Sequence, residues 1–161
     1  MPDNNRISTC LWFNDQAQEA ASFYTAIFPN SAILQVIHYS EAGRDIHRRE
    51  PGSVMLVEFE LDGHRYTALN GGPAFRFNQA TSLVVNCANQ EEIDHYWHRL
   101  CDGGDPAAQQ CGWLKDKYGI SWQVVPARIL DLFQADTDPE LTARCMAKMM
   151  KMKKIRIDDL T

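Results

Sequence analysis

Residues 7–29 read ISTCLWFNDQAQEAASFYTAIFP, and this stretch decides the fold. Residues 7–13 are apolar and rich in strand-forming side chains, which predicts a β-strand. An apolar helical stripe follows, and Pro29 ends it. The members of the stripe are Ala17, Ala20, Ala21, Tyr24 and Phe28. The stretch therefore predicts a strand that leads, through Asn14-Asp15, into a helix with one apolar face.

Three further strands are expected after this helix. Residues 32–39 are apolar, whereas residues 40–51 are charged and contain Gly43 and Pro51, which indicates a loop. Residues 54–61 and 64–69 flank Asp62-Gly63, a dipeptide typical of a β-hairpin turn. The first half is therefore predicted to be β-α-β-β-β.

The same order returns in the second half of the chain. Asn89 can cap a helix, and Glu92 completes a capping box with it. The aromatic pair Tyr96-Trp97 in this helix corresponds to Phe23-Tyr24 in the first. Strands are expected at residues 81–87, near Ala107, at 109–114 and at 120–125. The chain thus consists of two similar halves and a C-terminal extension.

Composition limits the class of protein. The chain has 161 residues, of which 45% are hydrophobic and 23% charged, and its net charge is −5. This acidity argues against a nucleic-acid partner, because such binding depends on cations that neutralise phosphates. No apolar run approaches the roughly 20 residues of a membrane helix, and the polar N-terminus predicts no signal peptide. The five cysteines form no CxxC motif, so we expect reduced thiols and a cytoplasmic protein.

Short motifs along nearly the whole chain resemble the PhnB-like family of the vicinal oxygen chelate superfamily, which includes glyoxalase I, bleomycin resistance proteins and dioxygenases. The motifs are Cys10-Leu-Trp-Phe13, Ala20-Ala-Ser-Phe-Tyr24, Phe28-Pro-Asn-Ser31, Leu69-Asn-Gly-Gly-Pro73, Gln90-Glu91-Glu92, Gly112-Trp-Leu-Lys-Asp-Lys-Tyr-Gly119, Ser121-Trp-Gln123 and Met152-Lys-Lys154. The family often carries the label 3-demethylubiquinone-9 3-methyltransferase.

The resemblance implies an α+β fold of paired βαβββ modules with a C-terminal helical extension. We expect one glyoxalase-like domain over residues 1–161, with modules at about 5–70 and 80–126 and the extension at about 127–161. It also implies a homodimer, because members of the superfamily commonly pair or exchange modules between chains.

The resemblance also locates the metal site of the superfamily. Its ligands are typically His, Gln or Glu, and the family spacing carries them onto Thr9, Thr67, Ser82 and Gln123. Hydroxyls and an amide supply neither charge nor a basic nitrogen, so they are poor ligands for zinc, nickel or iron. We therefore expect no metal and no cofactor.

The same positions are suited to a small-molecule pocket. Strand alternation predicts that Thr9, Leu11 and Phe13 face a cavity while Cys10 and Trp12 face the helix, and that Ser121 and Gln123 face it while Trp122 packs beneath the second helix. The alternative is a filled core in which the polar groups satisfy one another. The expected ligand-binding residues are Thr9, Leu11, Phe13, Thr67, Asn70, Ser82, Val84, Trp113 and Gln123.

Asn70 is expected at the cavity mouth, beside Gly71-Gly72-Pro73. This segment is not the GxGxxG of a dinucleotide site, and neither a doubly wound parallel sheet nor a glycine-rich first turn is evident. The sequence therefore argues against a protein of the common S-adenosylmethionine-dependent class. It argues in the same way against methyl transfer, the activity that the family label names.

The C-terminal extension is expected to hold a short helix around Ile129, Leu130 and Phe133 and a longer one that starts near Pro139. Leu141, Cys145, Met149 and Met152 form an apolar stripe in the second, with Met146 and Met150 alongside. Such a stripe is core, a dimer contact or an adaptable binding surface.

Three hypotheses follow. The first is a protein that binds an unidentified small molecule without metal. The second is a metal-dependent lyase, isomerase or dioxygenase with displaced ligands. The third is a non-enzymatic scaffold that binds a protein partner.

Overall fold

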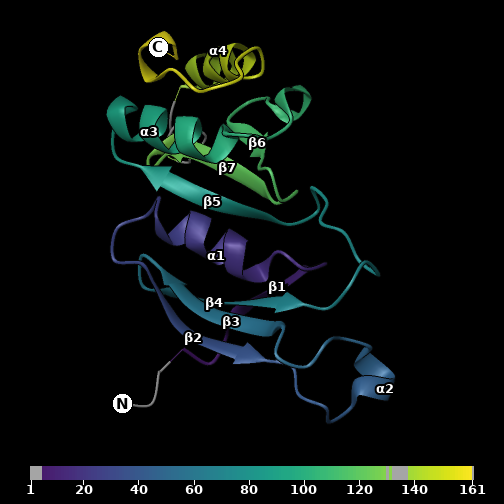
Figure 1. Cartoon of the computed structure of the whole chain (residues 1–161). Coiled ribbons are helices and arrows are strands. Elements are labelled where there is room, and N and C mark those ends of the chain that lie inside the picture. The colour runs from purple at the N-terminus through teal and green to yellow at the C-terminus, as the bar shows by residue number, and fades with distance from the viewer. Residues whose placement is uncertain (1–4, 130, 132–137, 161) are drawn as a thin grey trace. The chain divides into compact units, whose positions relative to one another are not determined.

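The structure is a computed structural model that describes residues 5–129, 131 and 138–160 (Figure 1). The chain forms two compact units, residues 1–76 and 77–161. Each unit combines a small β-sheet with helices, so the fold is α+β, as the sequence predicts. No helix in the described part of the chain has the length and apolar character needed to cross a membrane.

The first unit is a four-stranded sheet with one main helix. Its strands are β1 (Thr9–Phe13), β2 (Ala32–His38), β3 (Val54–Leu61) and β4 (His64–Asn70), in the order β1-β4-β3-β2. Strand β1 runs parallel to β4, and the other neighbours are antiparallel. The main helix, α1 (Ala17–Thr25), follows β1, and a short helix, α2 (Arg44–His47), interrupts the expected loop.

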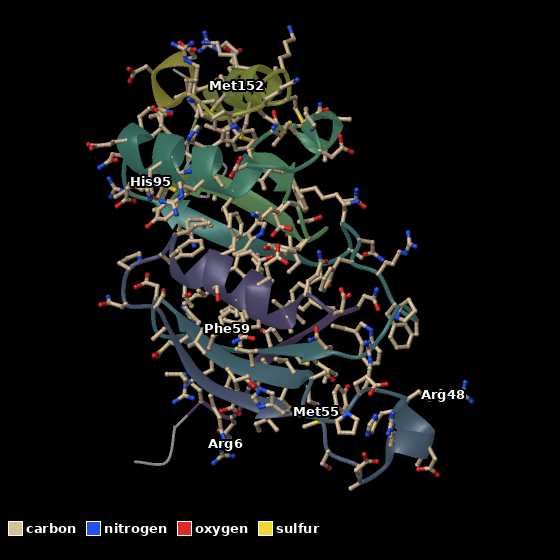
Figure 2. All side chains as sticks on the ribbon, in the orientation of Figure 1. Arg6, Arg48, Met55, Phe59, His95 and Met152 are labelled. Carbon is tan, nitrogen blue, oxygen red and sulfur yellow. The ribbon has the colours of Figure 1, made fainter. Side chains whose placement is uncertain are left out.

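The core of the first unit lies between α1 and one face of this sheet. Ala17, Ala20 and Ala21 are fully buried, and Tyr24 is 1% exposed. The Tyr24 ring stacks on Phe59 of β3 at a centroid distance of 6.5 Å, and Phe59 is labelled on the sheet in Figure 2. The small alanines let the helix backbone approach the sheet, so the predicted apolar stripe is the packing surface.

The second unit repeats the strand-helix order with a shorter sheet. Its strands are β5 (Ser82–Cys87), β6 (Trp113–Lys115) and β7 (Ser121–Pro126), in the order β5-β7-β6. Helix α3 (Gln90–Cys101) follows β5, and Asn89 caps it by accepting a hydrogen bond from the Glu92 backbone N–H at 2.9 Å. This bond is the one that the capping box predicts.

The strand expected near Ala107 is a wrong prediction. Residues Pro106–Ala108 form a 3-10 helix, η1, whose first turn Asp105 caps through a 2.9 Å hydrogen bond from the Ala107 N–H. Proline at the first helical position and an Asp cap favour a helical turn over a strand. The strand expected at 109–114 is also shorter, because Gln110 makes only an isolated bridge to Trp113 before β6 begins.

The C-terminal extension adds α4 (Pro139–Met149) and the 3-10 helix η3 (Ile157–Asp159). Cys145 is buried in a cluster with Val125, Ile129, Ile155 and Leu160, against which Met149 and Met152 pack. Met146 and Met150 are instead exposed, as is Leu141. The stripe is therefore partly core. Leu130 and Phe133, in the predicted short helix, lie outside the described residues.

Candidate ligand-binding site

Strand β1 has the opposite orientation from the one that its sequence predicts. Leu11 and Phe13 are 8% and 3% exposed and lie on the sheet face that α1 covers. They pair with Ala68 and Asn70, and the Asn70 side chain bonds the first residue of α1. The strand is apolar on both sides, and a slip of one residue exchanges the two faces. Leu11 and Phe13 are thus core residues and do not line a cavity.

Asn70 is a structural cross-link and does not lie at a cavity mouth. It is 6% exposed. Its Oδ1 accepts a hydrogen bond from the Ala17 N–H at 2.8 Å, and its Nδ2 donates to the Val54 carbonyl at 3.1 Å. The Tyr39 hydroxyl donates to the Asn70 carbonyl at 2.6 Å. The side chain therefore ties the start of α1 to β3 and is not available to a ligand.

The two candidate positions of the first unit lie on opposite faces of its sheet. Thr9 pairs with Tyr66 on the α1 face, whereas Thr67 pairs with Cys10 and Glu58 on the other face. One ligand cannot contact both threonine side chains within this unit. Cys10 is the β1 residue that pairs directly with Thr67, and burial raises the pKa of its thiol.

Strand β7 of the second sheet has the orientation that its sequence predicts, with Trp122 toward α3 and Gln123 away from it. Trp122 and Val124 are buried on the side of α3, and Gln123 lies on the opposite face. Its Nε2 donates to the Ser82 hydroxyl at 2.9 Å. Val84 and Trp113 pair with Gln123 from the strands on either side, so this face brings together four of the predicted residues.

A depression of about 520 Å³ lies at the β6 edge of this sheet, within the second unit. It is lined by Gln79, Ala108, Gln110, Cys111, Trp113, Leu114, Lys115, Ser121 and Met150. Of the predicted site residues, Trp113 belongs to this lining, whereas Ser82, Val84 and Gln123 are not among the lining residues. The volume lies in the range of about 300–1,000 Å³ that is usual for small-molecule pockets.

Several chain segments build the depression. Gln110 Nε2 donates to the Met150 carbonyl at 3.2 Å, and the Cys111 N–H donates to the Met152 carbonyl at 2.8 Å. Cys111 Sγ lies 3.8 Å from Met150 Sδ. These bonds hold the segment before β6 against the segment after α4. Sequence reasoning missed Gln110, Cys111 and Met150 as site residues, because the contacts that join them are distant in sequence.

Lys115 and Ser121 are two more lining residues that are absent from the list of expected ligand-binding residues. They are directly paired across β6 and β7, so their side chains lie on the same face of the sheet. Trp113 is two positions before Lys115 and shares that face. Alternation from Trp113 is the signal that could have identified Lys115.

A buried carboxylate organises the turn between β6 and β7. Asp116 is 3% exposed and its Oδ1 accepts hydrogen bonds from the Tyr118 N–H at 2.8 Å and the Ile120 N–H at 3.1 Å. Its Oδ2 accepts from the Trp122 indole N–H at 2.8 Å. These hydrogen bonds fix the backbone of the turn that carries Lys115 and Ser121. The Asp116 carboxylate itself bonds Trp122, whose side chain lies on the opposite face of the sheet from Ser121.

The divalent metal implied by the vicinal oxygen chelate resemblance does not fit these residues. The carried-over positions supply hydroxyls and one amide, and the amide of Gln123 already bonds Ser82. Within the described ranges, no three His, Cys, Asp or Glu side chains gather as a metal-binding group. Burial raises the pKa of Cys87 to about 12 and that of Cys101 to about 11, so both thiols stay protonated at neutral pH.

Solved structures share this fold. The PhnB protein from Bacillus cereus is 35% identical, with a TM-score of 0.65, and the match covers 76% of this chain and all (100%) of that one. The fosfomycin resistance protein FosX from Listeria monocytogenes, solved with Mn(II) and sulfate, is 13% identical with a TM-score of 0.56, over 82% of this chain and 99% of that one. At that identity the likeness to FosX concerns the fold alone. No curated protein matches the chain.

A family model described as 3-demethylubiquinone-9 3-methyltransferase matches residues 5–125. The match includes both sheets and every element from β1 through β6, together with nearly all of β7. With the Bacillus cereus relative, it confirms the resemblance seen in the motifs. The chain therefore belongs to the PhnB-like, 3-demethylubiquinone-9 3-methyltransferase family of the vicinal oxygen chelate superfamily.

Proposed function

We propose that this PhnB-like protein binds a small organic molecule, without a metal, in the depression beside Trp113. The observation that carries the proposal is the depression itself, about 520 Å³ in volume and lined by both apolar and polar side chains. An aromatic wall with a few polar groups is the usual composition of a small-molecule site. Of the expected ligand-binding residues the proposal keeps Trp113, and it adds the other side chains that line the depression at the edge strand β6.

The lining supports binding more directly than it supports catalysis. Trp113 offers an aromatic surface, and Met150 offers a flexible apolar one. The ionisable side chains among the lining residues are those of Cys111 and Lys115, and the lining contains no carboxylate or imidazole that could act as a base. Positioning of the bound molecule is therefore the contribution that these residues can make.

The methyltransferase name of the family is not adopted as an activity in this proposal. The described strands form one four-stranded and one three-stranded sheet, each with antiparallel pairs. The common S-adenosylmethionine fold is instead a doubly wound parallel sheet.

All five cysteines are free thiols, which supports a location in a reducing cytoplasm.

Filling the depression should abolish ligand binding. Ala108 lines the depression, so Ala108→Trp places an indole in the space that a ligand would occupy. We expect small aromatic fragments to shift the Trp113 indole N–H resonance of the native protein and to lose at least about tenfold in affinity for this variant. The measurement is NMR titration with a fragment set.

The matched control is Ala107→Trp. Ala107 is its neighbour in η1, is exposed, and is not among the lining residues. Fragments should bind this control as they bind the native protein. Equal binding to both variants, or no fragment that perturbs Trp113, would refute the proposed site.

Native mass spectrometry of untagged protein tests the metal and the homodimer together. We expect a species of twice the 18.4 kDa chain mass that carries no transition metal. The homodimer is expected from the family resemblance. The absence of metal is expected because the candidate ligand positions supply only hydroxyls and one amide. Stoichiometric zinc, nickel, manganese or iron would favour the metal-dependent alternative, and a monomer at micromolar concentration would contradict the dimer.

A further inference from the structure

Two polar side chains in the depression have no partner in the described part of the protein. Ser121 is 2% exposed as a whole residue, and no hydrogen bond joins its hydroxyl to another described residue. No buried side-chain nitrogen or oxygen among the described residues lacks a hydrogen-bond partner, so this hydroxyl is not an orphaned buried group. We infer that its oxygen reaches the space of the depression, where a bound ligand can accept its hydrogen bond.

Lys115 is the second unpaired group. Its side chain is half-buried and forms no ion pair or hydrogen bond with any described residue. No Asp or Glu is among the residues that line the depression. The nearest carboxylate in sequence, Asp116, accepts its hydrogen bonds from Tyr118, Ile120 and Trp122. The positive charge of Lys115 is thus left uncompensated at the depression.

The β-ladder places these two groups side by side. Lys115 and Ser121 are direct partners across β6 and β7, at the end of β6 where the turn begins. Partners across an antiparallel pair have Cβ atoms about 4.5–5.5 Å apart, which lets an ammonium and a hydroxyl donate to the same small anion. A carboxylate accepts several such hydrogen bonds, and bonds between charged groups are the strong ones.

The remainder of the lining is suited to an apolar body. Trp113, Leu114 and Met150 surround the same depression and carry no charge. A single cation balances a single negative charge, which favours a monoanion over a phosphate dianion. We propose that Lys115 and Ser121 form a carboxylate-binding site, and that the ligand of this protein is an apolar monocarboxylate whose body lies against Trp113. This inference rests on the proposed function of the depression.

A pair of probes of equal shape tests the inference. 2-Naphthoate and 2-naphthamide share the same rings and differ in the charge of one group. We expect the native protein to bind naphthoate about tenfold or more tightly than naphthamide, measured by isothermal titration calorimetry. Raising the salt concentration should weaken the binding of naphthoate and leave that of naphthamide unchanged.

Variants separate charge from shape. Lys115→Met keeps the apolar stem and removes the ammonium, so it should abolish the preference for naphthoate while naphthamide binds as before. Ser121→Ala should reduce the preference by about threefold. The control is Lys117→Met, because Lys117 is exposed and is absent from the lining. This control should keep the full preference.

The outcomes distinguish the two proposals. Equal affinity for both probes, or a preference that survives Lys115→Met, would overturn the carboxylate site and leave the small-molecule depression intact. Failure of both probes to bind, with no change in the Trp113 resonance, would overturn the proposed function as well. Unchanged naphthamide binding by Lys115→Met also verifies that the variant is folded.

Discussion

Replacement of Asp116 by alanine should lower the free energy of unfolding by about 3–5 kcal/mol, a large part of the 5–15 kcal/mol typical of small domains. The carboxylate accepts three hydrogen bonds, from two backbone N–H groups and the Trp122 indole, and the residue is 3% exposed. Its loss leaves the Ile120 and Trp122 donors buried. Urea denaturation followed by tryptophan fluorescence measures the effect.

A second variant and a control make this prediction specific. Asp116→Asn keeps an oxygen for the two backbone donors but turns an amide N–H₂ toward the Trp122 indole N–H, so its effect should be intermediate. Asp105 also accepts a backbone N–H, from Ala107, but is exposed. Asp105→Ala should cost about 1 kcal/mol or less. Equal costs for Asp116→Ala and Asp105→Ala would contradict the role given to Asp116.

Replacement of Asn70 by alanine should cost about 2–3 kcal/mol, because one side chain satisfies a buried backbone N–H and a part-buried backbone carbonyl. The Ala17 N–H at the start of α1 would lose its acceptor and the Val54 carbonyl its donor. The Ala17 amide should also exchange with solvent faster, since the first turn of α1 is then uncapped. Chemical denaturation and hydrogen exchange report these two effects separately.

Asn89 offers a matched comparison for Asn70. It caps α3 through the Glu92 N–H but is exposed, so water can replace its oxygen after Asn89→Ala. We expect that substitution to cost about 1 kcal/mol. If Asn70→Ala proved no more destabilising than Asn89→Ala, then the cross-link between α1 and β3 would not be what stabilises the first unit.

Local patterns were sufficient for most of the helices and strands. Residues 54–61 form β3 with the predicted bounds, and Asp62-Gly63 makes the predicted turn, with both residues at positive φ. The alternation of Ser121, Trp122 and Gln123 also predicts correctly which side chains of β7 face α3. In these segments polar residues alternate with apolar ones over at least three positions, Glu58 to Glu60 in β3 and Ser121 to Gln123 in β7, and this alternation identifies the buried face.

Where the alternation is missing, the predicted orientation of the strand was wrong. Cys10, Leu11, Trp12 and Phe13 are apolar on both sides of β1, so the strand alone does not identify its buried face. The register with β4 decides it, because Asn70 beside Phe13 must reach the start of α1. Asn70 and Phe13, both predicted to contact a ligand, are therefore core residues.

The sequence by itself determined the class and family of this protein, since residue spacing, turn residues and short motifs are local properties that can be identified along the chain without knowledge of its tertiary structure. Only the tertiary structure decided where a ligand can bind. The depression requires η1, β6 and Met150 to meet, and the hydrogen bonds that join them connect residues about forty positions apart in the chain. Such contacts depend on how separate elements pack together, and no periodicity within one element encodes that packing.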